Sequence, residues 1–560
     1  MADNPSLHRH DTTDPITTTT TTTTSTSTST SKHSSTTPSS TTPPTGSATT
    51  PPPRAGRRAW LGLAALMLPV LLVSIDNTVL SFAIPQLSQA LSPTASQLLW
   101  IVDIYPLMLA GLLVTMGTLG DRVGRRRLLL IGATGFGAVS VYAAFAGDAS
   151  HLIAARALLG LFGATLMPST LALLRNLFLD DNQRRLAIAI WASAFSAGSA
   201  LGPIVGGWLL EHFWWGSIFL INVPVLVVLL VVAPFLLPES RNPGSVRLDP
   251  VSVVLSVVSM LPFVFGIKKL ASSGISTLGV ASLLLGVALG VVFVRRQVRS
   301  RTPLLEVGLF KNRVFSASVL ANFMAIFSIS GLIFFVSQYL QLVLDLSPME
   351  AGLYLLPGAA ATVVMGLAAV VLARVAPIWL LIPTGLLLAT AGYLLGTTLT
   401  GSSSVGVIVV IFVLVGGGAG LAETLTNDAI LASVPPERAG AASGISETAY
   451  ELGASLGVAI LGSVLAAVYR TRLELPAGLD PTVADQAQQT LGGAVSAADG
   501  LPAGQADALL EAARAAFAHG VDLTSAIGAV LAFLTAVSIG IALRSAQRAT
   551  RRAGLVELQG

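Results

Sequence analysis

Two glutamates lie inside a long apolar stretch of this chain of 560 residues. Glu447 and Glu451 stand four residues apart within residues 440–468, a run long enough to cross a bilayer, which takes roughly 20 residues. On a helix this spacing places both carboxyls on one face, beside Tyr450. A charged side chain at bilayer depth costs at least about 2.5–3.5 kcal/mol, so such residues usually line a polar path. Because two neighbouring carboxyls in a low dielectric do not easily both ionise, one should hold a proton near neutral pH, as proton-coupled transport requires. The alternative is a pair of acids at a helix–helix contact, satisfied by buried partners.

The composition is that of a membrane protein. Apolar residues make up 53% of the chain and charged residues 11%, and the mean hydropathy is +0.76. The 53 glycines and 30 prolines fit close helix packing and broken helices in a membrane bundle. The chain has no cysteine, and its six histidines show no metal-ligand spacing within an apolar segment, so we expect neither disulfides nor a metal. Basic loops explain the pI near 9.6, so we do not expect a nucleic-acid partner.

The chain divides into a polar tail and a long apolar part. Residues 1–58 are rich in Thr, Ser and Pro, lack the apolar residues of a core, and are predicted to be a disordered cytoplasmic tail. Fourteen apolar runs of spanning length follow, centred near Pro69, Ala110, Val139, Phe162, Phe195, Val227, Ser256, Leu285, Ile329, Thr362, Leu388, Val413, Gly453 and Leu531.

Positive charge predicts the orientation of these runs. Arginines concentrate in one set of alternating loops and after the last run, and an even number of runs places both ends on that side. We therefore predict a multi-pass protein of the plasma (inner) membrane with both termini in the cytoplasm. The opposite loops hold little beyond Lys268 and Lys269 before residues 470–520, a segment predicted to lie outside. Within it, residues 505–519 are amphipathic and able to form a helix; a surface hairpin and a gating or lipid-facing role both stay open.

The loop after the second run, residues 117–130, combines glycines, one aspartate and arginines. The glycines permit a tight turn and close helix approach, and Asp121 can pair with a neighbouring arginine or a helix end. An ordinary basic loop explains the arginines but not the spacing of the other residues. The positions of this pattern are Gly117, Gly120, Asp121, Arg122, Gly124, Arg125 and Arg126.

Two further patterns lie within the fourth and fifth runs. Arg156, inside the apolar residues 152–164, needs an anionic or carbonyl partner at that depth. In residues 197–209, small residues four apart let helices touch backbone to backbone, and Pro203 bends the helix. The positions of this second pattern are Gly198, Gly202, Pro203, Gly206 and Gly207.

These segments resemble the major facilitator superfamily, and within it the fourteen-helix drug:proton antiporters, which include quaternary-ammonium and antiseptic exporters. Residues 117–130 resemble its signature loop, residues 152–164 its buried-arginine motif, and residues 197–209 its antiporter motif. Further similar segments, within a resemblance that covers roughly residues 59–550, are residues 75–87, 98–111, 214–224 and 446–453.

The resemblance implies an all-α membrane protein with the major facilitator fold, two six-helix bundles plus two inserted helices, 14 transmembrane helices in all. Substrate would bind near the midplane between the bundles, whose rocking would expose it to each side in turn. The predicted divisions are the disordered tail 1–58, the first bundle 59–240, the inserted helices 241–300, the second bundle 301–545 with external loop 470–520, and a cytoplasmic tail 546–560.

The resemblance also implies a transporter rather than an enzyme. The expected function is a proton-coupled multidrug efflux antiporter that exports cationic amphipathic compounds such as quaternary ammonium antiseptics and dyes. The sequence contains no Walker A loop, so we expect the proton gradient to supply the energy and expect no cofactor. The expected partners are cationic drugs, protons and the lipid bilayer, and we expect a monomer.

The candidate acids within the apolar runs are Asp76, Asp103, Glu423, Asp428, Glu447 and Glu451. By resemblance, proton coupling or gating is assigned to Asp76, Asp103 and Arg156, with a purely structural ion pair as the alternative for Arg156. Asp428 lies near the membrane edge, where structural pairing is expected.

Substrate recognition is assigned to Glu447 and Glu451. A bound cation would stabilise the carboxylate anion, and a proton would replace it after release. Tyr450 and Trp100 would add cation–π contacts. Some relatives that export divalent cations carry another carboxylate in the tenth helix, but residues 351–373 contain no acid, which predicts poor handling of divalent cations.

Two other functions stay open. One is export of an endogenous antibiotic, siderophore or lipid-like metabolite, which a basic pocket would favour and only Arg156 supports. The other is a membrane receptor or scaffold that transports nothing.

Overall fold

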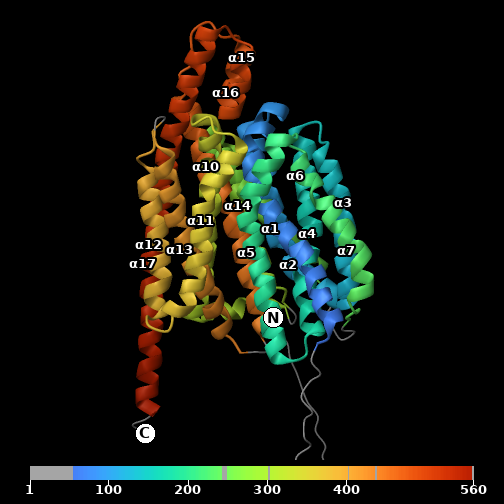
Figure 1. Cartoon of the computed structure of the whole chain (residues 1–560). Helices are drawn as coiled ribbons and strands as arrows, with labels where there is room; N and C mark the ends of the chain where they lie inside the picture. Colours follow the sequence, from blue (N-terminus) through green and yellow to red (C-terminus); the bar gives the residue numbers. More distant parts are fainter. Residues whose placement is uncertain (1–54, 242–248, 301–302, 401–402, 436–437, 558–560) are drawn as a thin grey trace, which may run out of the picture. The chain divides into compact units, whose positions relative to one another are not determined.

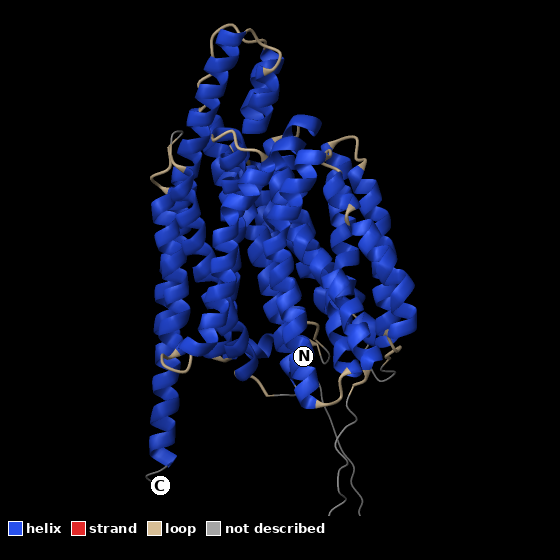
Figure 2. Ribbon diagram, viewed as in Figure 1, coloured by secondary structure: helices blue, strands red, loops and turns tan. Residues whose placement is uncertain are grey.

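The computed structural model describes residues 55–241, 249–300, 303–400, 403–435 and 438–557, and every regular element in these ranges is a helix (Figure 2). Within them, 14 spans are long and apolar enough to cross a membrane. Each span contains one of the fourteen predicted centres, so the prediction of an all-α protein with fourteen spans is confirmed. Residues 1–54, most of the predicted Thr-rich tail, lie outside the described residues.

The first six spans are α1 (Arg57–Leu91), α2 (Ala95–Val123), α3 (Arg125–Ala144), α4 (Ala149–Leu177), α5 (Asp181–His212) and the pair α6 (Ser217–Leu220) and α7 (Asn222–Leu236). The two inserted helices are α8 (Pro250–Ser273) and α9 (Thr277–Arg299). The last six spans are α10 (Arg313–Gln338) with the π-helix η2 (Tyr339–Val343), α11 (Pro348–Leu372), α12 (Ile378–Gly396), α13 (Val405–Ala432), α14 (Ala439–Arg472) and α17 (Ala503–Glu557). The short helices are η1 (Val307–Lys311), α15 (Pro481–Gln489) and α16 (Leu491–Ala498).

Capping residues set several of the helix boundaries. Thr94 and Gln97 form a capping box at the start of α2, where the Gln97 backbone N–H donates to Thr94 Oγ1 at 3.2 Å. Ser347 and Glu350 form the same motif at the start of α11, with Pro348 in its first turn. These local signals start each helix independently of its tertiary contacts.

The long helices pack as two groups that meet along a seam (Figure 1). In the first group α1 packs against α5, and α4 packs against α2 and α3. In the second group α10 packs against α14, and α13 packs against α11 and α12. The groups meet where α2 packs on α14 and α5 packs on α11, and the inserted helix α8 contacts both α2 and α14. The inserted helix α8 therefore touches both groups rather than one.

Polar contacts join the two groups near the end where α1 leads into α2. The predicted topology places this end outside, and it is called the outer end. Pro85 of α1 has no backbone N–H, so it leaves the carbonyl of Ser81 without its helical partner. Ser337 of α10 donates its hydroxyl to that carbonyl at 2.7 Å. Gln341 Nε2 donates to the Phe82 carbonyl at 3.2 Å. These contacts hold the two groups together at the outer end.

The segment predicted as an external loop at 470–520 is largely helical. It contains α15, α16 and the start of α17, and the Tyr469 hydroxyl donates to the Ala487 carbonyl at 2.8 Å. The predicted amphipathic helix at 505–519 exists as the first part of α17. That helix has 55 residues, so it is roughly 80 Å long and exceeds the hydrocarbon core of roughly 30 Å. It extends beyond the neighbouring spans at both ends and continues past residue 545, the predicted end of the second bundle (Figure 1). The other predicted domain boundaries stay predictions.

Candidate functional site

The acidic face of α14 is the first feature of the candidate site. Glu451 is 3% exposed, and its Oε2 atom has no hydrogen-bond partner among the described residues. Glu447 lies one turn nearer the start of α14 and is half-buried. None of the ion pairs within the described part of the chain involves either glutamate. The alternative was a pair of acids satisfied by buried partners, but no cationic partner of either glutamate is present among the described residues.

Tyr450 places this face at the seam between the two helix groups. Its half-buried ring meets Phe195 of α5 edge-on, with 5.8 Å between the ring centroids. Because α5 belongs to the first group and α14 to the second, the aromatic pair bridges them. A relative motion of the groups would separate these two rings.

Asp76 of α1 and Arg156 of α4 form a buried ion pair. Arg156 Nη1 donates to Asp76 Oδ2 at 2.6 Å, and both side chains are almost fully buried. Arg156 Nε donates to the Ile101 carbonyl at 3.3 Å, and the guanidinium lies 4.4 Å from the centre of the Tyr105 ring. The anionic and carbonyl partners that an arginine needs at this depth are therefore both present. The assignment of this pair to proton coupling stays a prediction.

Asp103 of α2 pairs with a lysine that the sequence analysis placed in a loop. Lys268 Nζ donates to Asp103 Oδ1 at 2.8 Å, and neither side chain reaches solvent. The loop prediction for Lys268 was wrong because α8 continues to Ser273 and buries this residue in its last turns. The second oxygen of Asp103, Oδ2, has no partner among the described residues. The inserted helix is thus tied to α2 by a buried charge pair.

Trp100, predicted to contact substrate, contacts this lysine. Lys268 Nζ lies 3.6 Å from the centre of the Trp100 ring, a cation–π distance. One face of the ring is therefore occupied by a cation of the protein itself. A substrate role for Trp100 stays a prediction.

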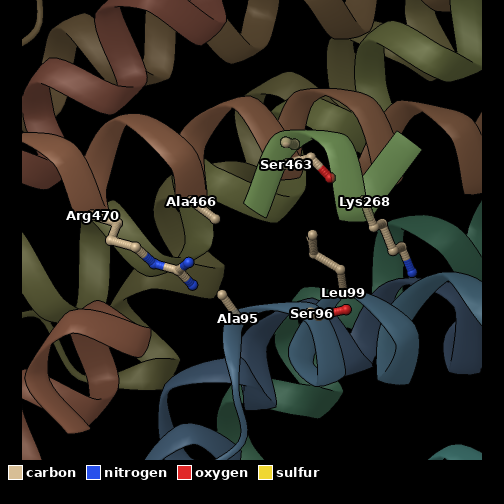
Figure 3. Close-up of a pocket in the computed structure, with 8 residues that line it drawn as sticks. Ala95, Ser96, Leu99, Lys268, Ser463, Ala466 and Arg470 are labelled. Carbon is tan, nitrogen blue, oxygen red and sulfur yellow. The ribbon is translucent and has the colours of Figure 1, made fainter. Parts of the chain in front are cut away.

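A small pocket lies beside Lys268, between the outer ends of α2, α8 and α14 (Figure 3). Its walls include Leu99, Lys268 and Ser463, and its volume of about 10 Å³ suits roughly one water molecule. It is too small for a drug-sized ligand.

The signature loop forms the pairing expected within it. Arg125 donates to Asp121 Oδ1 from Nε, and Nη2 lies at the same distance, 2.7 Å. Gly124 has φ +116°, and a Cβ there would lie 2.7 Å from Glu239 Oε1, so only glycine fits. Arg126 donates its backbone N–H to Glu239 Oε1 at 3.1 Å and its Nη1 to the carbonyl of Leu237 at 3.0 Å. The loop therefore holds the segment after α7, and Glu239 is a partner that the sequence analysis did not identify.

The glycines of α5 bring two helices into close contact with it. A Cβ on Gly198 would lie 2.7 Å from Ser74 Cβ, and one on Gly206 would lie 2.7 Å from Val79 Cγ2, both on α1. A Cβ on Gly202 would likewise fall within the van der Waals radius of the Thr78 hydroxyl of α1.

The neighbouring positions of α5 face the other helix group. A Cβ on Gly207 would lie 2.8 Å from Met349 Cα, and one on Gly352 would lie 2.5 Å from the Pro203 carbonyl. The backbones of α5 and α11 therefore touch at the outer end, as the small residues predict.

Comparison with known proteins gives the same family along most of the chain. The family model described as Major Facilitator Superfamily matches residues 66–458. The chain is 53% identical over 492 residues to the multidrug efflux pump LfrA of Mycolicibacterium smegmatis, covering 88% of this chain and 97% of that one. It is 38% identical over 507 residues to the methyl viologen resistance protein SmvA of Salmonella typhimurium, covering 88% and 99%. It is 33% identical over 502 residues to the tetracenomycin C resistance and export protein of Streptomyces glaucescens, covering 88% and 92%.

Solved structures share the fold at low sequence identity. A bacterial homolog of the human lysosomal transporter Spinster, inward-facing and unoccupied, matches with TM-score 0.60 and 17% identity, covering 88% of this chain and 99% of that one. The tetrameric PepTSo2 matches with TM-score 0.52 and 15% identity, covering 87% and 99%. These likenesses concern the arrangement of the helices.

Proposed function

Because the chain belongs to the major facilitator superfamily and is a multi-pass membrane transporter, we propose that it exports cationic amphipathic compounds in exchange for protons. The names of its relatives support drug export: one is a multidrug efflux pump and another confers resistance to methyl viologen. The observation that carries the cationic class is the acidic face of α14, where a buried Glu451 and a half-buried Glu447 have no ion-pair partner within the described residues.

The exchange rests on competition for these carboxylates. A cation that binds beside Glu447 stabilises the ionised form and expels a proton, and a proton restores the neutral form after the cation leaves. Glu447 lies eight residues from the start of α14 at Ala439, so roughly 12 Å of helix separates it from the proposed cytoplasmic end. A cation arriving from the cytoplasm therefore reaches Glu447 before the deeper Glu451.

The proton gradient is the proposed source of energy. Exchange of one proton for one monovalent cation moves no net charge, so only the pH difference drives it, at about 1.36 kcal/mol per pH unit. If both glutamates release a proton, the membrane potential adds about 2.3 kcal/mol per 100 mV. We place both termini in the cytoplasm and the transporter in the plasma membrane. The even number of spans supports the part of this placement that puts both termini on one side.

Export of an endogenous product is a second candidate function. The relative named as a tetracenomycin C resistance and export protein favours it. Such products are often not cationic, and the intramembrane Arg156 that would suit an anion is already paired with Asp76. This pairing is the reason to place the cationic class first.

Purified protein in vesicles tests the proposal. With an imposed pH gradient, wild type should accumulate ethidium and release protons when the dye is added. Glu447→Gln should lower ethidium transport at least tenfold because it removes the first anionic contact, and Glu451→Gln should lower the number of protons released for each ethidium moved. Glu211→Gln, an exposed acid on α5, is the control and should behave as wild type. Vesicles in which wild type neither moves the dye nor releases protons would favour a receptor or scaffold.

A further inference from the structure

Beyond this general function, on which the inference rests, we propose that Glu423 of α13 and Glu447 of α14 form a two-carboxylate site for bis-cationic amphiphiles. These are compounds whose two positive charges are separated by an aromatic or alkyl spacer. Each carboxylate would neutralise one charge, so Glu423 would matter for dications and little for monocations. The tenth span contains no acid, which by itself predicts poor handling of divalent cations. The structure provides a second carboxylate from a different helix.

The connection between the two helices places the carboxylates at the same depth. α13 ends at Ala432 and α14 begins at Ala439, so the two helices run in opposite directions from a short link. Glu423 lies nine residues before the end of α13, and Glu447 lies eight residues after the start of α14. Both are therefore roughly 12–14 Å from the same end of the bundle, at 1.5 Å per residue.

Polar contacts show that α13 and α14 meet beside these two glutamates. Asn427 stands one turn after Glu423 on α13, and its Oδ1 accepts a hydrogen bond from Ser446 Oγ at 2.6 Å. Ser446 is the residue before Glu447. Both glutamates are half-buried, so a ligand can reach them.

Two buried oxygen atoms beside this pair lack hydrogen-bond donors. Asn322 of α10 is 1% exposed, and its amide Nδ2 donates to the Ser446 carbonyl at 3.1 Å. Its Oδ1 atom has no partner among the described residues. Glu451 Oε2, one turn from Glu447, is also unpartnered. Unsatisfied buried acceptors are rare in folded proteins, because each one costs free energy. Acceptors without donors next to two carboxylates favour a ligand that brings positive charge.

An aromatic pair completes the site. Tyr450 lies three residues after Glu447 and meets Phe195 of α5 with 5.8 Å between the ring centroids. A flat cationic ring can stack on such a surface and gain cation–π attraction of about 0.5–2 kcal/mol. The site therefore offers two anions for charge and an aromatic wall for the spacer.

Transport of a dication and a monocation by the same vesicles tests the inference. Methyl viologen carries two positive charges and ethidium carries one. Glu423→Gln should lower methyl viologen transport at least tenfold and change ethidium transport less than twofold, whereas Glu447→Gln should lower both. Asp428→Asn, an exposed acid on the same helix, is the matched control and should change neither. Glu423→Asp, which keeps the charge on a shorter side chain, should recover part of the methyl viologen transport.

The ratio of the methyl viologen transport rate to the ethidium transport rate distinguishes the possible results. Equal loss of both substrates in Glu423→Gln, or loss of neither, would overturn the inference while leaving cation export intact. If wild type transports ethidium but not methyl viologen, the site does not serve dications and the inference fails. If wild type transports neither compound, the proposed function itself fails. If Glu423→Gln does not insert in the membrane, Glu423→Asp serves in its place. A ratio of methyl viologen to ethidium transport in Glu423→Asp equal to that of wild type would count against the inference.

Discussion

The buried pair of Asp103 and Lys268 is the residue-level feature that the sequence could least reveal. The two residues are separated by 165 positions, and their contact depends on how α8 packs against α2. Lys268 follows an apolar run, so the charge pattern predicted that it lies in a loop. A lysine in a loop is solvated and needs no charged partner. Asp76 and Arg156 could be recognised as buried charges, since each stands alone in an apolar run. Their mutual pairing, like that of Asp103, required the tertiary structure.

Removing one member of the Asp103–Lys268 pair should destabilise the protein more than removing both. A single neutral substitution leaves an uncompensated buried charge, which costs about 3–5 kcal/mol, whereas neutralising both members is often tolerated. We therefore expect Asp103→Asn and Lys268→Met each to lower the melting temperature in detergent, and the double variant to recover most of the loss. If Asp103 also carries protons, the double variant will regain stability but not proton release on addition of ethidium. Single variants as stable as wild type would contradict the ion pair.

At the level of elements, hydropathy predicted the spans because each must satisfy its own backbone within the bilayer. Helix ends outside the bilayer have no such constraint. The prediction therefore gave the centre of α17 near Leu531 but not its length of 55 residues. The acidic face of α14 could be predicted from spacing alone, but the alignment of Glu423 with Glu447 depends on the link between α13 and α14. The same limit applies to Glu239, whose contact with the signature loop joins distant parts of the first helix group.

Asp249 connects the two inserted helices outside the membrane span. It caps α8 by accepting from the Val251 N–H, and Arg296 of α9 donates to both of its carboxylate oxygens at 2.8 and 2.9 Å. Hydrogen bonds from Arg296, and then from Ser252, hold the pKa of Asp249 well below its usual range. We expect Asp249→Ala to lower the free energy of unfolding by about 1–2 kcal/mol, from the lost cap and the partly exposed ion pair.

The pH dependence of this loss follows from the lowered pKa. The unfolded carboxyl titrates near 3.9, so the stabilisation is fully present above that pH and disappears as the pH falls through the lower folded value. Thermal unfolding in detergent should therefore show a constant difference between wild type and Asp249→Ala from pH 8 to 5, and a smaller one below about pH 4. Asp249→Asn keeps a capping side chain and should lose only part of the stability. A difference that changes between pH 8 and 5 would indicate another titrating group.

At the level of the whole molecule, transport requires the two helix groups to separate at the outer end where they now touch. One close backbone approach there is between Gly207 of α5 and Met349 of α11. Gly207→Leu places a side chain where even a Cβ would be 2.8 Å from Met349 Cα, so the closed contact cannot form. We expect ethidium efflux to fall at least tenfold, because the cycle loses one of its two end states. Gly290→Leu is the control, since no atom lies within 4 Å of a Cβ at Gly290.

The absence of cysteine from the chain allows the opening to be measured directly. Ser337 is fully buried between α10 and α1, so a Ser337→Cys thiol should react slowly with a membrane-impermeant maleimide added from outside. In combination with Gly207→Leu, that reaction should become several-fold faster because the wedge holds the outer end open. The same thiol combined with Gly290→Leu should keep the slow rate. Unchanged labelling and unchanged efflux in Gly207→Leu would show that the α5–α11 contact does not close the outer end, and another contact, such as that between α2 and α14, would have to do so.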